Sequence, residues 1–90
     1  MTDKWLPLGS VVVLHGGNHQ LMIYGRLQKE VDGDELWDYV GCLFPEGNLG
    51  PEHTYIFNKD QIERVFFLGY QSVEEFDFMA QLDALKAEKA

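Results

Sequence analysis

Three histidines are the residues of this chain best suited to hold a metal ion. His15 and His19 flank two glycines and an asparagine, and a three-residue turn there would place the two imidazoles opposite each other in a hairpin. Such a pair could share a zinc ion, but catalytic zinc uses three protein ligands, and no third ligand is tied to this pair. Polar residues commonly flank a turn. We therefore predict that the chain binds no metal and no other cofactor.

Cys42, the single cysteine, could act as a nucleophile if a histidine activated it, and His53 is the nearest in sequence. In an extended strand, however, Cys42 points to the same side as Val40 and Phe44, where a small buried hydrophobic residue belongs. A reactive thiolate also needs an accessible and electropositive setting, whereas this neighbourhood is acidic. We interpret Cys42 as a core residue.

The serines and carboxylates provide no catalytic set either. Ser10 opens a predicted strand and Ser72 caps a predicted helix, so neither fits a serine triad. Five acids surround a predicted turn: Glu30, Asp32, Asp34, Glu35 and Asp38. The tip of a hairpin is normally exposed to solvent, so we favour a solvated group of charges over a catalytic or calcium-binding site. A small hydrolase or metal enzyme that uses His15, His19 and Cys42 is thus the least favoured function. We predict that the protein is not an enzyme.

The charge of the chain argues against two classes of partner. Its formal net charge is −8 and its pI is about 4.6, and its seven basic residues are scattered singly. Nucleic acids and anionic membrane surfaces attract clustered lysine and arginine, so we predict neither as a partner. An acidic protein of this kind attracts basic partners instead.

The length and composition predict one domain over residues 1–90, with 46% hydrophobic residues to fold it. One cysteine allows no internal disulfide. The start, MTDKWLPLGS, lacks the features of a signal peptide, and the longest apolar runs, VVVL and VFFL, are far shorter than a membrane span. We expect a cytoplasmic protein, although a leaderless export route would escape these tests.

Hydrophobic periodicity and turn residues predict five strands, at residues 10–14, 20–27, 35–44, 54–57 and 63–70. Asp32-Gly33 is the strongest turn signal and predicts a hairpin in which Ile23 faces Cys42 and Tyr24 lies over Gly41. Asn58 is expected to cap a single helical turn. The uninterrupted apolar run at residues 65–68 suggests that the last strand is buried on both faces.

The C-terminal segment changes to a helical period. Ser72 and Glu75 fit a capping box, and Phe78, Leu82 and Leu85 follow at helical spacing, so we predict an amphipathic helix over residues 72–88. The fold class is therefore α+β: a curled antiparallel meander of about five strands in residues 6–70 with one C-terminal helix. An open roll and a small SH3-like barrel both fit the pattern. We expect the apolar side of the helix to pack on the sheet, although its edge could serve a partner.

The loop at residues 45–53 is rich in proline and glycine, which indicates an ordered loop with little catalytic chemistry. Loops on a rigid sheet often carry binding residues. We therefore take as the candidate protein-binding surface the residues in and around this loop: Tyr39, Leu43, Phe44, Pro45, Glu46, Leu49 and Tyr55. The alternative is that their rings fill the thin core.

Four blocks of the chain together resemble a small bacterial family, domain of unknown function 4176: LPLGSVVVLHGG, LMIYGR, DYVGCLFPEGNLG and YIFNKDQIERVFFLGY. The resemblance covers residues 6–82. It implies a small protein of Gram-positive bacteria, encoded beside type VII secretion components and toxins that carry the LXG export domain. No catalytic residues come with it.

The resemblance implies an accessory role, such as an adaptor or targeting factor that binds the helical export domain of a co-encoded toxin before secretion. The alternative is an immunity protein whose acidic turn, residues 30–38, covers the basic active site of such a toxin. The sequence leaves both hypotheses open.

Overall fold

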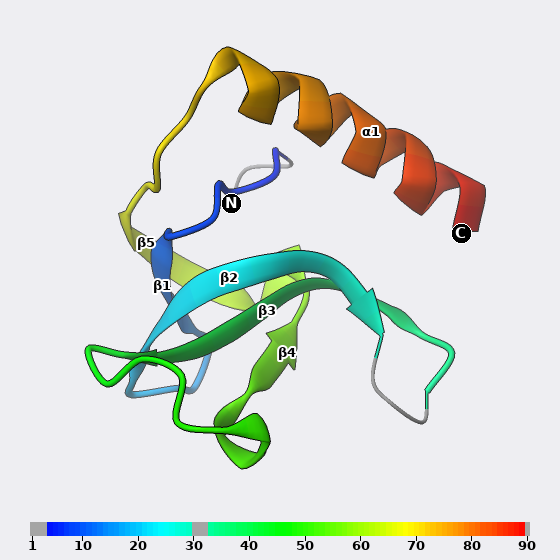
Figure 1. The fold of residues 1–90 in the computed structure, drawn as a ribbon. Coiled ribbons are helices and arrows are strands. Elements are labelled where there is room, and N and C mark those ends of the chain that lie inside the picture. The colour runs from blue at the N-terminus through cyan, green and yellow to red at the C-terminus, as the bar shows by residue number, and fades with distance from the viewer. Residues whose placement is uncertain (1–3, 30–32, 90) are drawn as a thin grey trace.

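Five strands form one antiparallel sheet in the order β4-β3-β2-β1-β5, and one helix lies across it (Figure 1). The computed structural model describes residues 4–29 and 33–89. The strands are β1 (Val11–Leu14), β2 (Gln20–Lys29), β3 (Leu36–Phe44), β4 (Tyr55–Phe57) and β5 (Ile62–Phe67), and the helix is α1 (Val73–Lys89). Two short 3₁₀ turns, Pro51–His53 and Lys59–Gln61, precede and follow β4. The predicted α+β fold is confirmed. Because β4 and β5 do not pair, the sheet is open and the barrel alternative is wrong.

The sheet is strongly curled because its two edge strands are close in sequence. Four strand-to-strand spacings of about 4.8 Å would separate β4 from β5 by about 19 Å in a flat sheet. Only residues 58–61 join them, and three of these are coiled into a 3₁₀ turn. Bulges in the β1–β5 and β2–β3 pairs provide the necessary bend. As predicted, Asn58 starts the connecting turn, where its backbone N–H donates to the Gln61 side chain at 2.7 Å.

The register of the β2–β3 hairpin follows the prediction on one side of a bulge only. From Gly25, opposite Val40, to Lys29 the pairing matches a two-residue turn at Asp32-Gly33, although Asp32 itself lies outside the described residues. Beyond the bulge the register shifts by one residue, so Gly41 faces Ile23 and the predicted Ile23–Cys42 and Tyr24–Gly41 pairs are wrong. A side chain at position 41 would approach the ring of Phe57, which covers this glycine in place of Tyr24.

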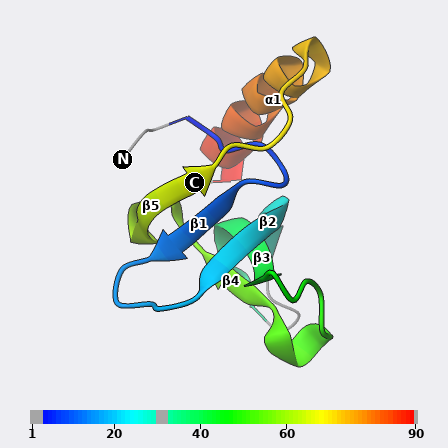
Figure 2. The same cartoon turned by 90° about the vertical axis from the view of Figure 1, so that its left-hand side faces the viewer.

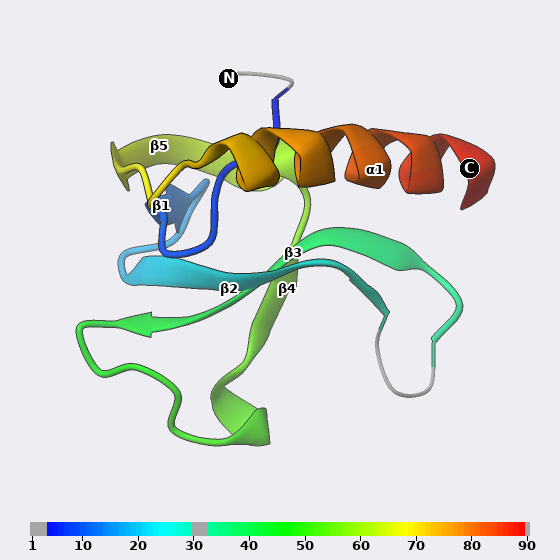
Figure 3. The same ribbon diagram turned by 45° about the horizontal axis from the view of Figure 1, so that its top comes forward.

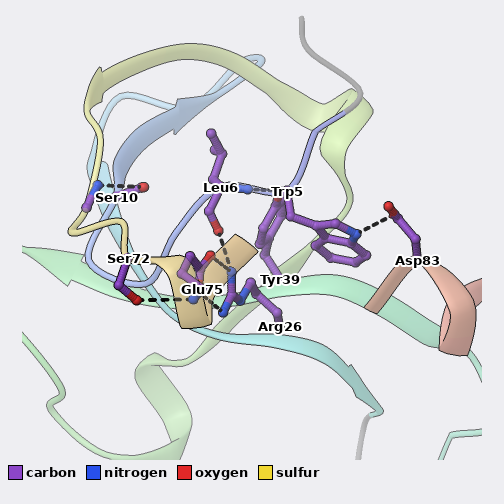
Figure 4. A network of polar contacts seen from close by, with 9 residues as sticks. Trp5, Leu6, Ser10, Arg26, Tyr39, Ser72, Glu75 and Asp83 are labelled. Carbon is purple, nitrogen blue, oxygen red and sulfur yellow. Dashed lines mark hydrogen bonds and ion pairs between the residues drawn. The ribbon is translucent and has the colours of Figure 1, made fainter. Parts of the chain in front are cut away.

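The core lies between the curled sheet, the helix and the N-terminal lead-in. Its buried apolar residues are Trp5, Leu6, Val12, Leu21, Ile23, Tyr39, Phe57, Ile62 and Leu82. Tyr39 is at the centre, with its ring edge-on to Trp5 at 5.6 Å and 5.7 Å from Phe57. Its hydroxyl accepts a hydrogen bond from the Leu6 backbone N–H at 2.8 Å (Figure 4). The lead-in therefore belongs to the core, because it fills the space between sheet and helix.

Burial of this phenol makes the stability of the protein sensitive to alkaline pH. Removal from water raises the pKa of Tyr39 from 10.0 to about 12, although the hydrogen bond from Leu6 opposes the shift. Because the folded state holds the proton more tightly than the unfolded state, the free energy of unfolding should fall between about pH 10 and pH 12. The expected slope is about 1.4 kcal/mol per pH unit. Urea unfolding at pH 9 and pH 11 measures it. The Tyr39→Phe variant should lack this part of the slope, and an unchanged slope in that variant would contradict the assignment.

The prediction that the last strand is buried on both faces is wrong. Phe66 and Phe67 in β5, and Leu68 after it, are all about half exposed or more. The reason is the position of β5 at the edge of the sheet, where it pairs only with β1 among the described strands (Figure 2). An apolar run favours burial, but the face of an edge strand is buried only where another layer of the protein packs on it.

The helix docks on the sheet through ion pairs as well as through the apolar side chains of Leu82 and Met79. Ser72 Oγ accepts from the Glu75 backbone N–H at 3.1 Å, so the predicted N-cap is confirmed. The Glu75 carboxylate, however, pairs with the buried Arg26 guanidinium, so the reciprocal half of the capping box is not made. Leu82 is the only buried apolar residue of α1 among those described. In residues 4–29 and 33–89, no helix has the length and apolar character needed to cross a membrane.

Candidate protein-binding surfaces

Cys42 and His15 lie in different settings, because the thiol is buried and the imidazole is exposed. Cys42 is buried in β3, opposite Met22, which confirms its interpretation as a core residue. His15 lies near Glu63, with Nδ1 3.8 Å from the carboxylate, and its backbone N–H donates to the Gln61 carbonyl at 2.9 Å. The described residues contain no group of three or more histidine, cysteine or acidic side chains that could hold a metal.

The acidic cluster predicted around the second turn is only partly present as a solvated tip. Asp34 and Glu35 are exposed, whereas Glu30 and Asp32 lie outside the described residues. Asp38 is buried. Its carboxylate accepts hydrogen bonds from Lys86 Nζ at 2.6 Å and from the Lys59 backbone N–H at 2.9 Å, which compensate for the loss of water. Its place in an exposed tip was therefore predicted wrongly. Its carboxylate fastens α1 to the sheet instead.

Six of the seven predicted surface residues lie at or near the surface around the 45–53 loop. Phe44, Pro45, Glu46, Leu49 and Tyr55 are exposed, and Leu43 is half-buried. Tyr39 does not belong with them, because its ring is fully buried between Trp5 and Phe57.

A small pocket opens beside this loop surface. Its volume is about 140 Å³, and it is lined by Leu14, Gly17, Asn18, His19, Leu21, Leu43 and Tyr55. This is smaller than the roughly 300–1,000 Å³ typical of cofactor and small-molecule sites.

A second surface lies where β5 leads into α1, and sequence reasoning missed it. We call it the apolar corner and define it by its exposed residues: Leu8, Phe66, Phe67, Leu68, Tyr70, Val73 and Phe76. Tyr70 is 84% exposed, Val73 78% and Phe67 61%. The Gly69 backbone N–H donates to Ser10 Oγ at 3.0 Å, which holds the β5–α1 connection against the segment that carries Leu8 (Figure 2).

One signal in the sequence could have revealed this corner. A single amphipathic helix cannot cover both faces of a five-stranded sheet, so part of the apolar run after residue 64 had to remain exposed.

A groove of about 520 Å³ adjoins the apolar corner. We call it the helix-entry groove, and it is lined by Leu8, Arg26, Tyr70, Ser72, Glu74, Glu75 and Phe78. The Arg26 guanidinium lies 5.3 Å from the centre of the Phe78 ring, donates to Glu75 Oε1 at 2.9 Å and to the Leu6 carbonyl at 3.3 Å (Figure 4). Because the charge of Arg26 is matched inside the protein, the groove presents apolar walls and the carboxylate of Glu74.

The sequence model of one family, described as "Domain of unknown function (DUF4176)", matches residues 5–78. The chain belongs to this family. The matched part of the DUF4176 domain runs from Trp5 in the core to Phe78 in the groove, so it includes the whole sheet, the apolar corner and the first turns of α1. No curated protein and no solved structure matches the chain.

Proposed function

We propose that this DUF4176 protein is a non-enzymatic, protein-binding accessory module that acts in the cytoplasm. The apolar corner is the observation that carries the proposal. Seven large apolar side chains are exposed there, five of them within residues 66–73. Phe66 and Phe67 are consecutive in β5 and point to opposite faces of the sheet, so these side chains surround the end of the strand. Large apolar side chains exposed together are a feature of protein interaction sites.

Two further features support binding of another protein. The outer edge of β5 has no neighbouring strand among the described residues, so its backbone groups are open to a partner. The pocket beside the 45–53 loop offers a place for a single apolar anchor.

For the partner, our proposal relies on the family resemblance. We propose that the protein is an adaptor or targeting factor in a Gram-positive bacterium, and that it binds a type VII-secreted toxin of the LXG class before export. The helical export domain of that toxin is the proposed binding partner.

Co-expression with the toxin encoded by the adjacent gene tests this function. A complex should survive size-exclusion chromatography at micromolar concentration. The double variant Phe67→Ser/Val73→Ser should weaken it at least about tenfold, because two exposed anchors are lost. Phe44→Ser/Leu49→Ser makes the corresponding change in the 45–53 loop surface, and stronger weakening by this variant would move the main binding site from the apolar corner to that loop. A chain that stays alone with every neighbouring gene product would refute the proposal.

The same experiment addresses the immunity alternative, which the exposed Asp34 and Glu35 favour. An immunity protein would bind the C-terminal catalytic domain of the toxin rather than its N-terminal export domain. It would also protect cells that produce the toxin. Truncated toxins in the co-expression assay separate the two functions.

A further inference from the structure

The charged side chains of α1 divide into two groups according to the side of the helix they occupy. Those that face the rest of the protein are matched: Glu75 by Arg26, Asp83 by the indole N–H of Trp5 at 2.8 Å, and Lys86 by Asp38. Glu74, Asp77 and Glu88, which are all exposed, make no ion pair or hydrogen bond with the described residues.

The unmatched carboxylates lie along one side of the helix, in a row whose middle position is the uncharged Gln81 and with Asp77 beside Glu74. Glu74, Gln81 and Glu88 are seven residues apart, which is close to two helical turns, so they lie nearly above one another. The row extends over about 21 Å at 1.5 Å per residue. α1 continues as a single helix over this whole length (Figure 3).

An apolar line runs beside this acidic row. Phe78 and Leu85 are also seven residues apart and are both about two-fifths exposed. At Phe78, nearer the N-terminus of α1, the line continues into the helix-entry groove, whose other apolar walls are Leu8 and Tyr70. One side of α1 therefore presents an apolar track with carboxylates along its outer border.

We propose that the helix-entry groove and the adjoining Phe78–Leu85 line bind a basic amphipathic helix of a partner protein. This inference rests on the proposed function and specifies the partner chemistry. A helix that lies along α1 would place its apolar residues, spaced three and four apart, against the Phe78–Leu85 line. Lysine or arginine on its flank would meet Glu74 and Glu88. About 14 residues span the distance between these two carboxylates.

A second copy of this chain does not fit the same surface. The acidic row of one copy would meet the acidic row of the other, and the formal net charge of −8 adds long-range repulsion. The apolar contacts supply most of the affinity for a basic helix, because exposed ion pairs are individually weak. The carboxylates supply orientation, fast association and sensitivity to salt.

Two synthetic 18-residue helical peptides test the proposal. Both carry the same leucine stripe, and one has lysine on the flanking positions where the other has glutamate. Titrations by fluorescence anisotropy use the full chain and two variants of equal charge change. One is Glu74→Lys/Glu88→Lys on α1, and the control variant is Glu52→Lys/Glu63→Lys, at two exposed acids outside α1. We expect the wild-type chain and the control variant to bind the lysine peptide. The α1 variant should bind it at least about tenfold more weakly and should gain affinity for the glutamate peptide.

Other results would overturn the inference. Equal weakening by both variants would mean that only net charge attracts the peptide, and weakening by the control variant alone would place the site outside α1. Absence of binding by the wild-type chain at about 1 mM lysine peptide would also refute it. With the co-expressed toxin, a complex that resists Glu74→Lys/Glu88→Lys removes only this inference, whereas absence of any complex removes the proposed function.

Discussion

Replacing Arg26 with methionine is expected to lower the free energy of unfolding by about 3–5 kcal/mol. The side chains of Arg26 and Glu75 are 3% and 12% exposed, so loss of the guanidinium leaves a carboxylate without its partner in a nearly dry site. The variant also loses the contact with Phe78 and the hydrogen bond to the Leu6 carbonyl. Urea unfolding followed by circular dichroism measures the change.

A second replacement shows whether the unpaired charge causes this loss. Adding Glu75→Leu to Arg26→Met removes the buried charge and should recover most of the lost stability, because apolar pairs of similar size substitute well for buried ion pairs. Glu63→Gln provides the exposed control, since its contact with His15 spans 3.8 Å at the surface, and should change stability by less than about 0.5 kcal/mol. A loss below about 1 kcal/mol for Arg26→Met would contradict the role given to this pair.

The second large effect is expected at Phe57. Its side chain is fully buried, packs against Tyr39, and lies close to Gly41, where β4 pairs with β3. Phe57→Ala should therefore cost about 3–5 kcal/mol, because the surrounding strands can only partly close the cavity. A small domain has about 5–15 kcal/mol in total, so the variant should be close to unfolding at 37 °C.

Phe67→Ala is the matched control for Phe57→Ala. The same side chain is removed, but Phe67 is 61% exposed in β5, so the loss should be below about 1 kcal/mol. Thermal melts of the two variants give the comparison. Equal losses would mean that Phe67 is covered in the folded protein and that the apolar corner is not a free surface.

Several features of the fold were predictable because their signals are local. The start of α1 at Ser72, the turn at Asn58 and the strand around Cys42 all follow from caps and periodicity within a few residues. Five of the seven residues of the predicted loop surface are exposed and Leu43 is half-buried, whereas Tyr39 is buried. That ring is drawn into the core because Trp5 and Leu6 return to pack on it.

Other features depend on segments that are far apart in the chain. Arg26 and Glu75 are 49 residues apart, and Asp38 and Lys86 are 48 apart, so no local pattern pairs them. The bulge between Ile23 and Gly25 shifts the hairpin register by one, although the turn signal was read correctly for the pairs nearest the turn. The apolar run in β5 suggested burial, but its exposure depends on the sheet order.

The sequence by itself determined the kinds of element, their order and the acidic character of this protein, because propensity, capping and composition act over short stretches. Only the tertiary structure decided which carboxylates are paired and which apolar side chains remain in contact with solvent. The physical reason is that burial and ion pairing depend on which distant segments meet. The apolar corner and the unmatched acidic row of α1 are the result of that long-range arrangement.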